Sequence, residues 1–338
     1  MDNLKIIVLD AASIGEDIDY SLFGKFGEVS VYQSTTSEQF AERAKEADII
    51  VQNKYKLNKE SLANAPRLKL VCEAATGFDN IDVEYCREHG IAVTNVPGYS
   101  TECVAQLTVA MALEIIMHLP EYTSFVSSGA YTSSGIANRL TPTFHELCGK
   151  TWGIVGFGSI GKKVSDIAKA FGCKVIACKR TPVPDIECTD IDTLCRKADI
   201  ISLHTPLNDG TRGMIGEKQL ALMKKDAILI NVARGAVLDE AAVAKAILEK
   251  RIGGFGCDVY SVEPFPTSHP YNEISCLPNV CMTPHIAWGA YETRLRLIGE
   301  MIKNISAFRD GEIRNRVDIL IQNSGFVKMG LLFFKANY

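Results

Sequence analysis

Apolar and polar residues follow one another along this chain in a pattern that predicts parallel β-sheets covered by helices. Short runs rich in β-branched residues recur between longer amphipathic stretches, which is typical of parallel strands joined by helical crossovers. A first series of predicted strands covers residues 5–10, 29–33, 48–53, 68–73 and 91–95. A second series covers residues 151–155, 174–177, 199–203, 227–231, 254–258 and 280–283. We therefore expect two sheets.

The helices between and after these series indicate how the two sheets share the chain. A long helix is predicted from about Thr101, and a weakly patterned stretch rich in Ser, Thr and Gly follows it over residues 118–149. Another helix, over about 291–309, comes after the last strand and needs a sheet to cover. Because the first sheet is incomplete, we predict that this helix returns to it and that the second domain is inserted into the first. The predicted domains are 1–99 with 287–338, and 100–286.

Composition and charge exclude several classes of partner. A chain of 338 residues comfortably forms two domains. The formal net charge of −4 offers no basic surface for nucleic acid or an anionic membrane. We expect no export, because no basic segment followed by an apolar run is seen near Met1. The apolar stretch 104–117 is too short to span a bilayer. The 11 cysteines contain no C-x-x-C pair, so we expect reduced thiols in a cytoplasmic protein and no metal site.

A glycine-rich loop follows the first strand of the second series. Gly156, Gly158 and Gly161 have the spacing G-x-G-x-x-G and precede a helical run over 162–171. In such a loop the first glycine permits a tight turn, the second lets a pyrophosphate approach the backbone, and the third lets helix and strand pack closely. The alternative is a strand-to-helix turn with incidental glycines. The residues expected to contact a dinucleotide here are Gly156, Gly158, Ser159, Ile160 and Gly161.

The next strand of this series ends in basic residues. A dinucleotide-binding domain that selects NAD usually carries an acid there, roughly 20 residues after the loop, to bind the ribose hydroxyls. This chain has Lys179, Arg180 and Thr181 instead. Because a cationic pair can bind a 2′-phosphate, we predict a preference for NADP(H) over NAD(H). In the alternative interpretation Lys179 and Arg180 are only solvated, and other groups hold NAD.

Three segments at strand ends carry residues that suit the reduction of a keto acid. Arg234, Glu263 and His285 each follow a predicted strand of the second series. Open parallel sheets bind their ligands beyond the carboxyl ends of the strands, so these side chains are expected at one edge. Taken singly, each could be structural. Their joint occurrence beside a dinucleotide loop favours a catalytic role.

These segments together resemble the family of D-isomer-specific 2-hydroxyacid dehydrogenases. The matching pieces are residues 75–82 and 95–101, the glycine loop and the three strand-end segments, and the likeness extends to about residue 316. The run His285-Ile-Ala-Trp288 is most similar to the hydroxypyruvate reductase (glycerate dehydrogenase) branch. The resemblance implies an NAD(P)-dependent oxidoreductase acting on small 2-keto or 2-hydroxy acids, with hydroxypyruvate or glyoxylate favoured. The expected fold is α/β, with a doubly wound Rossmann-like cofactor domain inserted into a smaller flavodoxin-like substrate domain.

The resemblance also implies roles for individual residues. Arg234 would bind the substrate carboxylate through two hydrogen bonds and polarise the C2 carbonyl. His285 would exchange the proton, and Glu263 would orient His285 and favour its charged form. Backbone amides near Thr76 and Gly77 would bind the carboxylate, and Lys54 is our own candidate for the pocket wall. The other residues expected to line the cofactor are Val104, His204, Thr205, Pro206, Val232, Ala233 and Asp258.

Other functions and the assembly state remain open at this point. A non-catalytic dinucleotide sensor of the co-repressor type, or a relative acting on another acid such as formate or a phosphoserine-pathway acid, would share much of the pattern. The family uses the region of residues 118–149 in a two-fold dimer, so a homodimer is expected. The apolar tail after about residue 316 does not resemble the family, and it packs on the body or covers a partner subunit.

Overall fold

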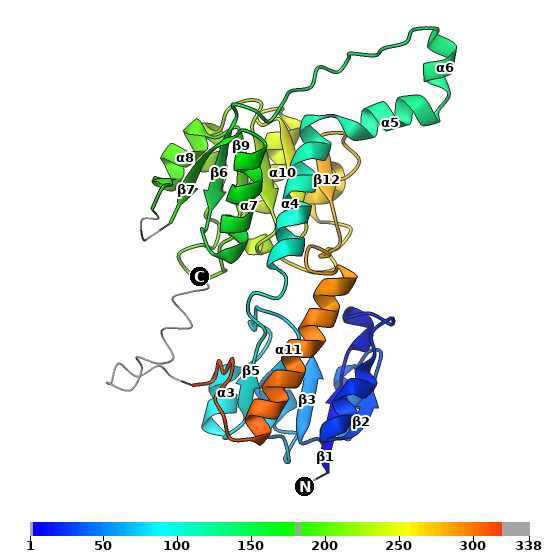
Figure 1. Cartoon of the computed structure of the whole chain (residues 1–338), viewed down its shortest axis with the longest axis vertical. Coiled ribbons are helices and arrows are strands. Elements are labelled where there is room, and N and C mark those ends of the chain that lie inside the picture. The colour runs from blue at the N-terminus through cyan, green and yellow to red at the C-terminus, as the bar shows by residue number, and fades with distance from the viewer. Residues whose placement is uncertain (1–2, 180, 182–183, 320–338) are drawn as a thin grey trace. The chain divides into compact units, whose positions relative to one another are not determined.

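The computed structural model describes residues 3–179, 181 and 184–319 and divides into two compact units (Figure 1). The first unit contains Met1–Tyr99 and the segment that starts at Gly289, and the second contains Ser100–Trp288. Arg180 and most of the apolar C-terminal tail lie outside the described residues. Each unit is described by itself.

The first unit is a five-stranded parallel sheet with helices around it. The strand order is β2-β1-β3-β4-β5, the flavodoxin-like order. The strands are β1 (Leu4–Val8), β2 (Gly27–Val31), β3 (Ile49–Gln52), β4 (Leu70–Glu73) and β5 (Ala92–Thr94). The helices are η1 (Ala11–Ser13), η2 (Tyr20–Phe26), α1 (Ser37–Ala44), α2 (Lys59–Leu62), α3 (Val83–Glu88) and α11 (Tyr291–Arg309). All residues of β3 and β4 are buried, and α11 packs against β4, so the returning chain covers this sheet.

The second unit is a seven-stranded parallel sheet in the order β12-β11-β10-β9-β6-β7-β8. The strands are β6 (Thr151–Val155), β7 (Lys174–Cys178), β8 (Glu187–Cys188), β9 (Ile200–Leu203), β10 (Ile228–Asn231), β11 (Gly254–Cys257) and β12 (Val280–Met282). The order reverses between β6 and β9, as in a Rossmann sheet, and such a switch point is where these folds bind ligands. The two parallel sheets confirm the predicted α/β fold class.

Helices cover both faces of this second sheet. They are α4 (Thr101–Ile116), α7 (Ser159–Ala170), α8 (Ile191–Lys197), α9 (Glu217–Leu222) and α10 (Glu240–Leu248), with the short turns η3 (Gly235–Val237) and η4 (Pro270–Glu273). The helix α4 packs against α7, β10 and β11, and seven of its side chains are buried. It is therefore a core helix of this unit.

The sequence pattern misplaced the start of one helix and missed a short strand and two helices. The helix α7 starts at Ser159 rather than 162, because Gly158 precedes its first turn and Gly161 lies within the helix. The two-residue strand β8 is too short to leave a pattern. The stretch 118–149 contains α5 (Leu119–Ser127) and α6 (Ala130–Ser134), neither of which buries any residue. A helix without a buried face carries no apolar periodicity, so these two helices could not be predicted from one.

The described residues were also searched for membrane-spanning helices, metal-binding groups and disulfides. No single helix in the described ranges is long and apolar enough to cross a membrane, while α4 and α5 reach that length and apolarity only as a pair bent by 65°. Within the same ranges no group of three or more His, Cys, Asp or Glu residues is arranged to hold a metal ion. All 11 cysteines are described, and each is a free thiol.

Candidate active site

His285 and Glu263 form a direct hydrogen-bonded pair at the carboxyl edge of the second sheet. Glu263 follows β11, His285 follows β12, and the Nδ1 atom of His285 lies 2.6 Å from Oε2 of Glu263. The other carboxylate oxygen of Glu263 accepts a hydrogen bond from the backbone N–H of Tyr260 over 3.0 Å. An ionised carboxylate only accepts hydrogen bonds, so Nδ1 of His285 carries the proton of this contact. Proton exchange with a substrate then falls to Nε2.

The backbone at His285 has a strained conformation that Asp258 supports. His285 has a positive φ of 56°, which is unfavourable for a non-glycine residue. The carboxylate of Asp258, at the end of β11, accepts hydrogen bonds from the Thr283 hydroxyl (2.6 Å) and from the N–H groups of Ile286 (2.7 Å) and Ala287 (2.8 Å). These three bonds hold both sides of His285. Burial raises the pKa of Asp258, while the bonds from Thr283 and the two amides oppose that rise.

Arg234 follows β10 in a turn that Asn231 shapes. The buried amide of Asn231 donates to the carbonyl oxygen of Arg234 (2.9 Å) and accepts from the N–H of Ala233 (3.0 Å). The Nη1 group of Arg234 donates to the carbonyl of Ala233 over 2.9 Å. The sequence analysis did not identify Asn231, although an amide side chain at the end of an apolar strand was a signal for it.

Gly235 brings the turn of Arg234 against the loop that carries Glu263. A Cβ atom at Gly235 would lie 2.0 Å from the carbonyl carbon of Tyr260 and 2.1 Å from the nitrogen of Ser261. Only glycine permits this contact between two backbones. The structure therefore joins the segments of Arg234, Glu263 and His285 within one unit. It adds Asn231, Gly235 and Tyr260, which the sequence analysis had not named as site residues.

The glycine loop has the geometry that a dinucleotide requires. Gly156 has a φ of +87°, and a Cβ there would lie 2.6 Å from the carbonyl oxygen of His204. A Cβ at Gly161 would lie 2.3 Å from the carbonyl oxygen of Gly156, so this glycine lets α7 pack on the loop. By contrast, a Cβ at Gly158 would meet nothing within 4 Å, which leaves open space above the backbone. The first N–H groups of an α-helix have no acceptor within the helix, so this space beside Ser159 and Ile160 in the first turn of α7 fits a pyrophosphate.

Lys179 lies beside this loop. Its Nζ atom donates a hydrogen bond to the carbonyl oxygen of Phe157 over 3.1 Å, so a cation from the end of β7 contacts the glycine loop itself. Thr181 is exposed, and Arg180 lies outside the described residues. The predicted role of this segment in binding a 2′-phosphate stays a prediction.

The remaining cofactor candidates differ in exposure. His204 follows β9, and burial lowers the pKa of its imidazole to about 3. Its Nε2 atom lies 2.9 Å from the Ser202 hydroxyl, while Nδ1 is buried and has no hydrogen-bond partner among the described residues. Val104 and Val232 are buried in the core of the unit. Thr205, Pro206 and Ala233 are partly or fully exposed. Their contacts with a cofactor stay predictions.

In the first unit, buried polar groups hold the two loops that carry the substrate-binding candidates. The buried carboxylate of Asp10 accepts the backbone N–H groups of Asn53 (3.0 Å), Lys54 (2.6 Å) and Tyr55 (3.1 Å). Thr76 donates from its hydroxyl to the Val96 carbonyl (2.9 Å), and Asn95 donates to the carbonyl of Thr76 (2.7 Å). Gly77 follows, half-buried. These loops have defined backbones, and their contact with a substrate stays a prediction.

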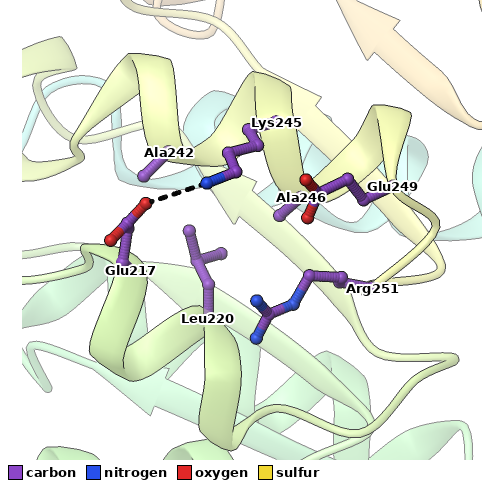
Figure 2. Close-up of a pocket in the computed structure, with 7 residues that line it drawn as sticks. All are labelled: Glu217, Leu220, Ala242, Lys245, Ala246, Glu249 and Arg251. Carbon is purple, nitrogen blue, oxygen red and sulfur yellow. Dashed lines mark hydrogen bonds and ion pairs between the residues drawn. The ribbon is translucent and has the colours of Figure 1, made fainter.

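A small hollow in the second unit lies between α9 and α10 and is separate from these residues (Figure 2). Lys245 donates to Glu217 across it over 3.4 Å. Its other lining residues are Leu220, Ala242, Ala246, Glu249 and Arg251. None of them is a predicted catalytic or cofactor-binding residue.

Comparison with known proteins identifies close relatives. Residues 109–287 match the family model of the D-isomer specific 2-hydroxyacid dehydrogenase, NAD binding domain. A glyoxylate reductase of Thermococcus litoralis is 41% identical over 301 residues, which cover 86% of this chain and 89% of that protein. A glycerate dehydrogenase of Methylorubrum extorquens is 34% identical over 315 residues, or 93% of this chain and 99% of that protein. The crystal structure of D-lactate dehydrogenase from Aquifex aeolicus with NAD and lactic acid has a TM-score of 0.83 and 32% identity, and the match covers 94% of this chain and 99% of that one.

Proposed function

Because this chain belongs to the D-isomer specific 2-hydroxyacid dehydrogenase family, we propose that it reduces a small 2-keto acid, with hydroxypyruvate or glyoxylate favoured, to the D-2-hydroxy acid. As a member of this family it is an oxidoreductase that acts on a CH–OH group with a nicotinamide dinucleotide. The observation that carries the proposal is the 2.6 Å contact between His285 and Glu263, with the loop of Glu263 packed against the turn of Arg234 at Gly235.

The chemistry divides between the cofactor and three side chains. The bound nicotinamide supplies the hydride that C2 of the keto acid receives. Arg234 binds the substrate carboxylate through two parallel N–H groups and polarises the C2 carbonyl. Nε2 of His285 gives its proton to the C2 oxygen, so the carbonyl becomes a hydroxyl group. In the oxidative direction the same atom takes the proton back.

Glu263 supports His285 in both directions. Its carboxylate keeps the proton on Nδ1, so that Nε2 faces the reaction, and its charge stabilises the imidazolium form that donates the proton. The other substrate-binding residues of this proposal are Lys54 and the backbone amides near Thr76 and Gly77.

A substrate panel tests this function. Oxidation of NADPH or NADH is followed by absorbance with glyoxylate, hydroxypyruvate, pyruvate, phenylpyruvate and 2-ketoisocaproate, and the first two should react fastest. His285→Ala should lower kcat about 10²- to 10⁴-fold and leave the cofactor Kd unchanged, because the imidazole acts on the proton alone. If none of the five acids reacts, the chain is not this reductase, and a dinucleotide-sensing role replaces it.

Lys179 supports a preference for NADP(H) over NAD(H). Lys179 follows β7, and its ammonium group contacts the glycine loop. An acid at the position of Lys179 would instead repel a 2′-phosphate. The ratio of kcat/KM for NADPH and NADH measures this preference directly. A tenfold preference for NADH would overturn it.

The arm formed by residues 118–146 supports a homodimer. No residue from 116 to 146 is buried, although the arm carries Ile136 and Leu140, which are 66% and 74% exposed. Figure 1 shows α5 and α6 standing away from the sheet of their unit. The occupant we propose for these apolar residues is a second copy of the chain, as the family resemblance implies. Light scattering should give twice the chain mass of 37.0 kDa, and a monomer would overturn the proposal.

The free cysteines support the location of this protein in a reducing compartment. All 11 cysteines are free, among them the exposed Cys148 and Cys276, so the cytoplasm is the location we propose. Fractionation of cells that express the tagged full chain tests it, and recovery outside the cytoplasmic fraction would contradict it.

A further inference from the structure

A second histidine–glutamate pair lies next to the active-site loop and takes no part in the proposed reaction. Glu240 is the first residue of α10, and one of its carboxylate oxygens lies 3.0 Å from Nε2 of His269. Their side chains are only 10% and 7% exposed, respectively, whereas Glu263 and His285 are 28% and 24% exposed. Charged side chains are rarely buried to this extent unless they bind a specific partner.

The partners of Glu240 are all hydrogen-bond donors. The backbone N–H of Ser261 donates to one carboxylate oxygen over 2.9 Å, and the Ser261 hydroxyl donates to the other. Nδ1 of His269 accepts the N–H of Tyr271 over 3.2 Å, so Nδ1 carries no proton and Nε2 must be the donor to Glu240. A carboxylate suits these three donors because both of its oxygens accept, whereas an amide side chain offers only one accepting atom.

Ser261 connects this pair to the catalytic residues. It lies two residues before Glu263 on the loop after β11, and residues 261–264 are all exposed. An exposed loop places a side chain accurately only if other contacts hold its backbone. Here Glu240 binds Ser261, and the N–H of the adjacent Tyr260 binds Glu263.

We propose that Glu240 and His269 are positioning residues that hold Glu263, and through it His285, in the geometry needed for proton transfer. This inference rests on the proposed function. Neither residue contacts the substrate in this proposal; they act through the loop backbone at Tyr260 and Ser261.

Glu240→Gln tests the proposal with little change in shape. The new amide nitrogen is a donor, and it would face either the Nε2 proton of His269 or the Ser261 groups, so one donor loses its acceptor. The loop should shift, and kcat should fall about tenfold to a hundredfold, the range that a misplacement of about 1 Å can cause. The cofactor Kd should stay within about twofold, because the glycine loop is not involved. Glu249→Gln makes the same substitution at the exposed end of the same helix and should leave kcat unchanged.

A double-mutant cycle with Glu263→Gln separates positioning from a general structural role. If Glu240 acts through Glu263, adding Glu240→Gln to Glu263→Gln should cost less than about threefold more in kcat. Losses that multiply, or an unchanged kcat in Glu240→Gln, would overturn the proposal. Should Glu240→Gln fail to fold, Ser261→Ala removes one donor only and is measured in the same cycle, with the same two outcomes.

A readout independent of turnover keeps this inference distinct from the proposed function. The ¹⁵N and ¹H signals of the His285 imidazole report its contact with Glu263 in the full chain. They should move in Glu240→Gln and stay in place in Glu249→Gln. If wild-type protein turns over no keto acid, the proposed function fails, but unchanged His285 signals in Glu240→Gln are what would reject the positioning role.

Discussion

The hydroxyl group of Tyr260 donates a hydrogen bond to the carbonyl oxygen of Thr283 over 2.8 Å. Tyr260 precedes Glu263 on the loop after β11, and Thr283 precedes His285 at the end of β12. The bond thus joins the two loops that carry Glu263 and His285 at a point away from the contact between these two side chains. Two loops connected by two hydrogen bonds have less freedom to move apart than loops connected by the contact between Glu263 and His285 alone.

Tyr260→Phe should therefore affect both stability and catalysis. Loss of this partly buried hydrogen bond should lower the free energy of unfolding by about 1 kcal/mol. It should also lower kcat several-fold, because Glu263 and His285 lose a support, while the cofactor Kd stays constant. Tyr20→Phe is the matched control, since the Tyr20 hydroxyl donates to the Ala11 carbonyl over 2.9 Å in the other unit. A similar loss of kcat in both variants would show that the effect is not specific to the site.

Arg234→Lys should impair catalysis although it keeps the charge. The guanidinium presents two parallel donors to a carboxylate, and an ammonium group cannot reproduce that geometry. We expect kcat/KM for the keto acid to fall about tenfold to a hundredfold, the cost of losing one charge-assisted hydrogen bond. Arg251→Lys changes an exposed arginine of the same unit and should have no effect. Near-normal kinetics for Arg234→Lys would contradict binding through both donors.

Lys179→Asp should reverse the predicted cofactor preference. A carboxylate at the end of β7 would repel a 2′-phosphate and accept hydrogen bonds from ribose hydroxyls. The KM for NADPH should rise at least about tenfold, the equivalent of about 1.4 kcal/mol, and the KM for NADH should fall. Lys174→Asp, at the exposed start of the same strand, is the control. If the ratio of the two KM values is the same in both variants, Lys179 does not select the cofactor.

Glu73→Gln should stabilise the protein at neutral and alkaline pH. Glu73 is 1% exposed, and burial, followed by the nearby charge of Asp10, raises its pKa well above the usual 4.5. The folded state therefore binds a proton that the unfolded state has lost, so stability falls as pH rises above about 4.5, toward the raised pKa.

In Glu73→Gln this dependence disappears, while the amide oxygen can still accept the Gln52 side chain that now donates to Glu73. Denaturant unfolding from pH 5 to 9 should show a stability difference in favour of the variant that grows with pH. Glu88→Gln, on the exposed end of α3, should change the free energy of unfolding by less than about 0.5 kcal/mol. A difference that shrinks with rising pH would mean that Glu73 is ionised and stabilising in the folded state.

The sequence alone was enough to predict the α/β class and most strands to within two residues, and it indicated that Arg234, Glu263 and His285 each follow a strand of the second sheet. These features are local: each strand carries its own apolar run, the glycine loop has a characteristic spacing, and parallel strands place their carboxyl ends at one edge. The apolar pattern did not predict α5 and α6, because helices without a buried face have no apolar periodicity.

Only the tertiary structure decided which residues hold that site in place. Gly235 packs on Tyr260, Asp258 binds the N–H groups on the far side of His285, and Glu240 binds Ser261 and His269, which follow it by 21 and 29 residues. No spacing along the chain encodes such pairs, because they form only when β10, β11 and β12 lie side by side. Residue type and order therefore determined the chemistry that this edge can perform, and packing between distant segments determined the geometry in which it is performed.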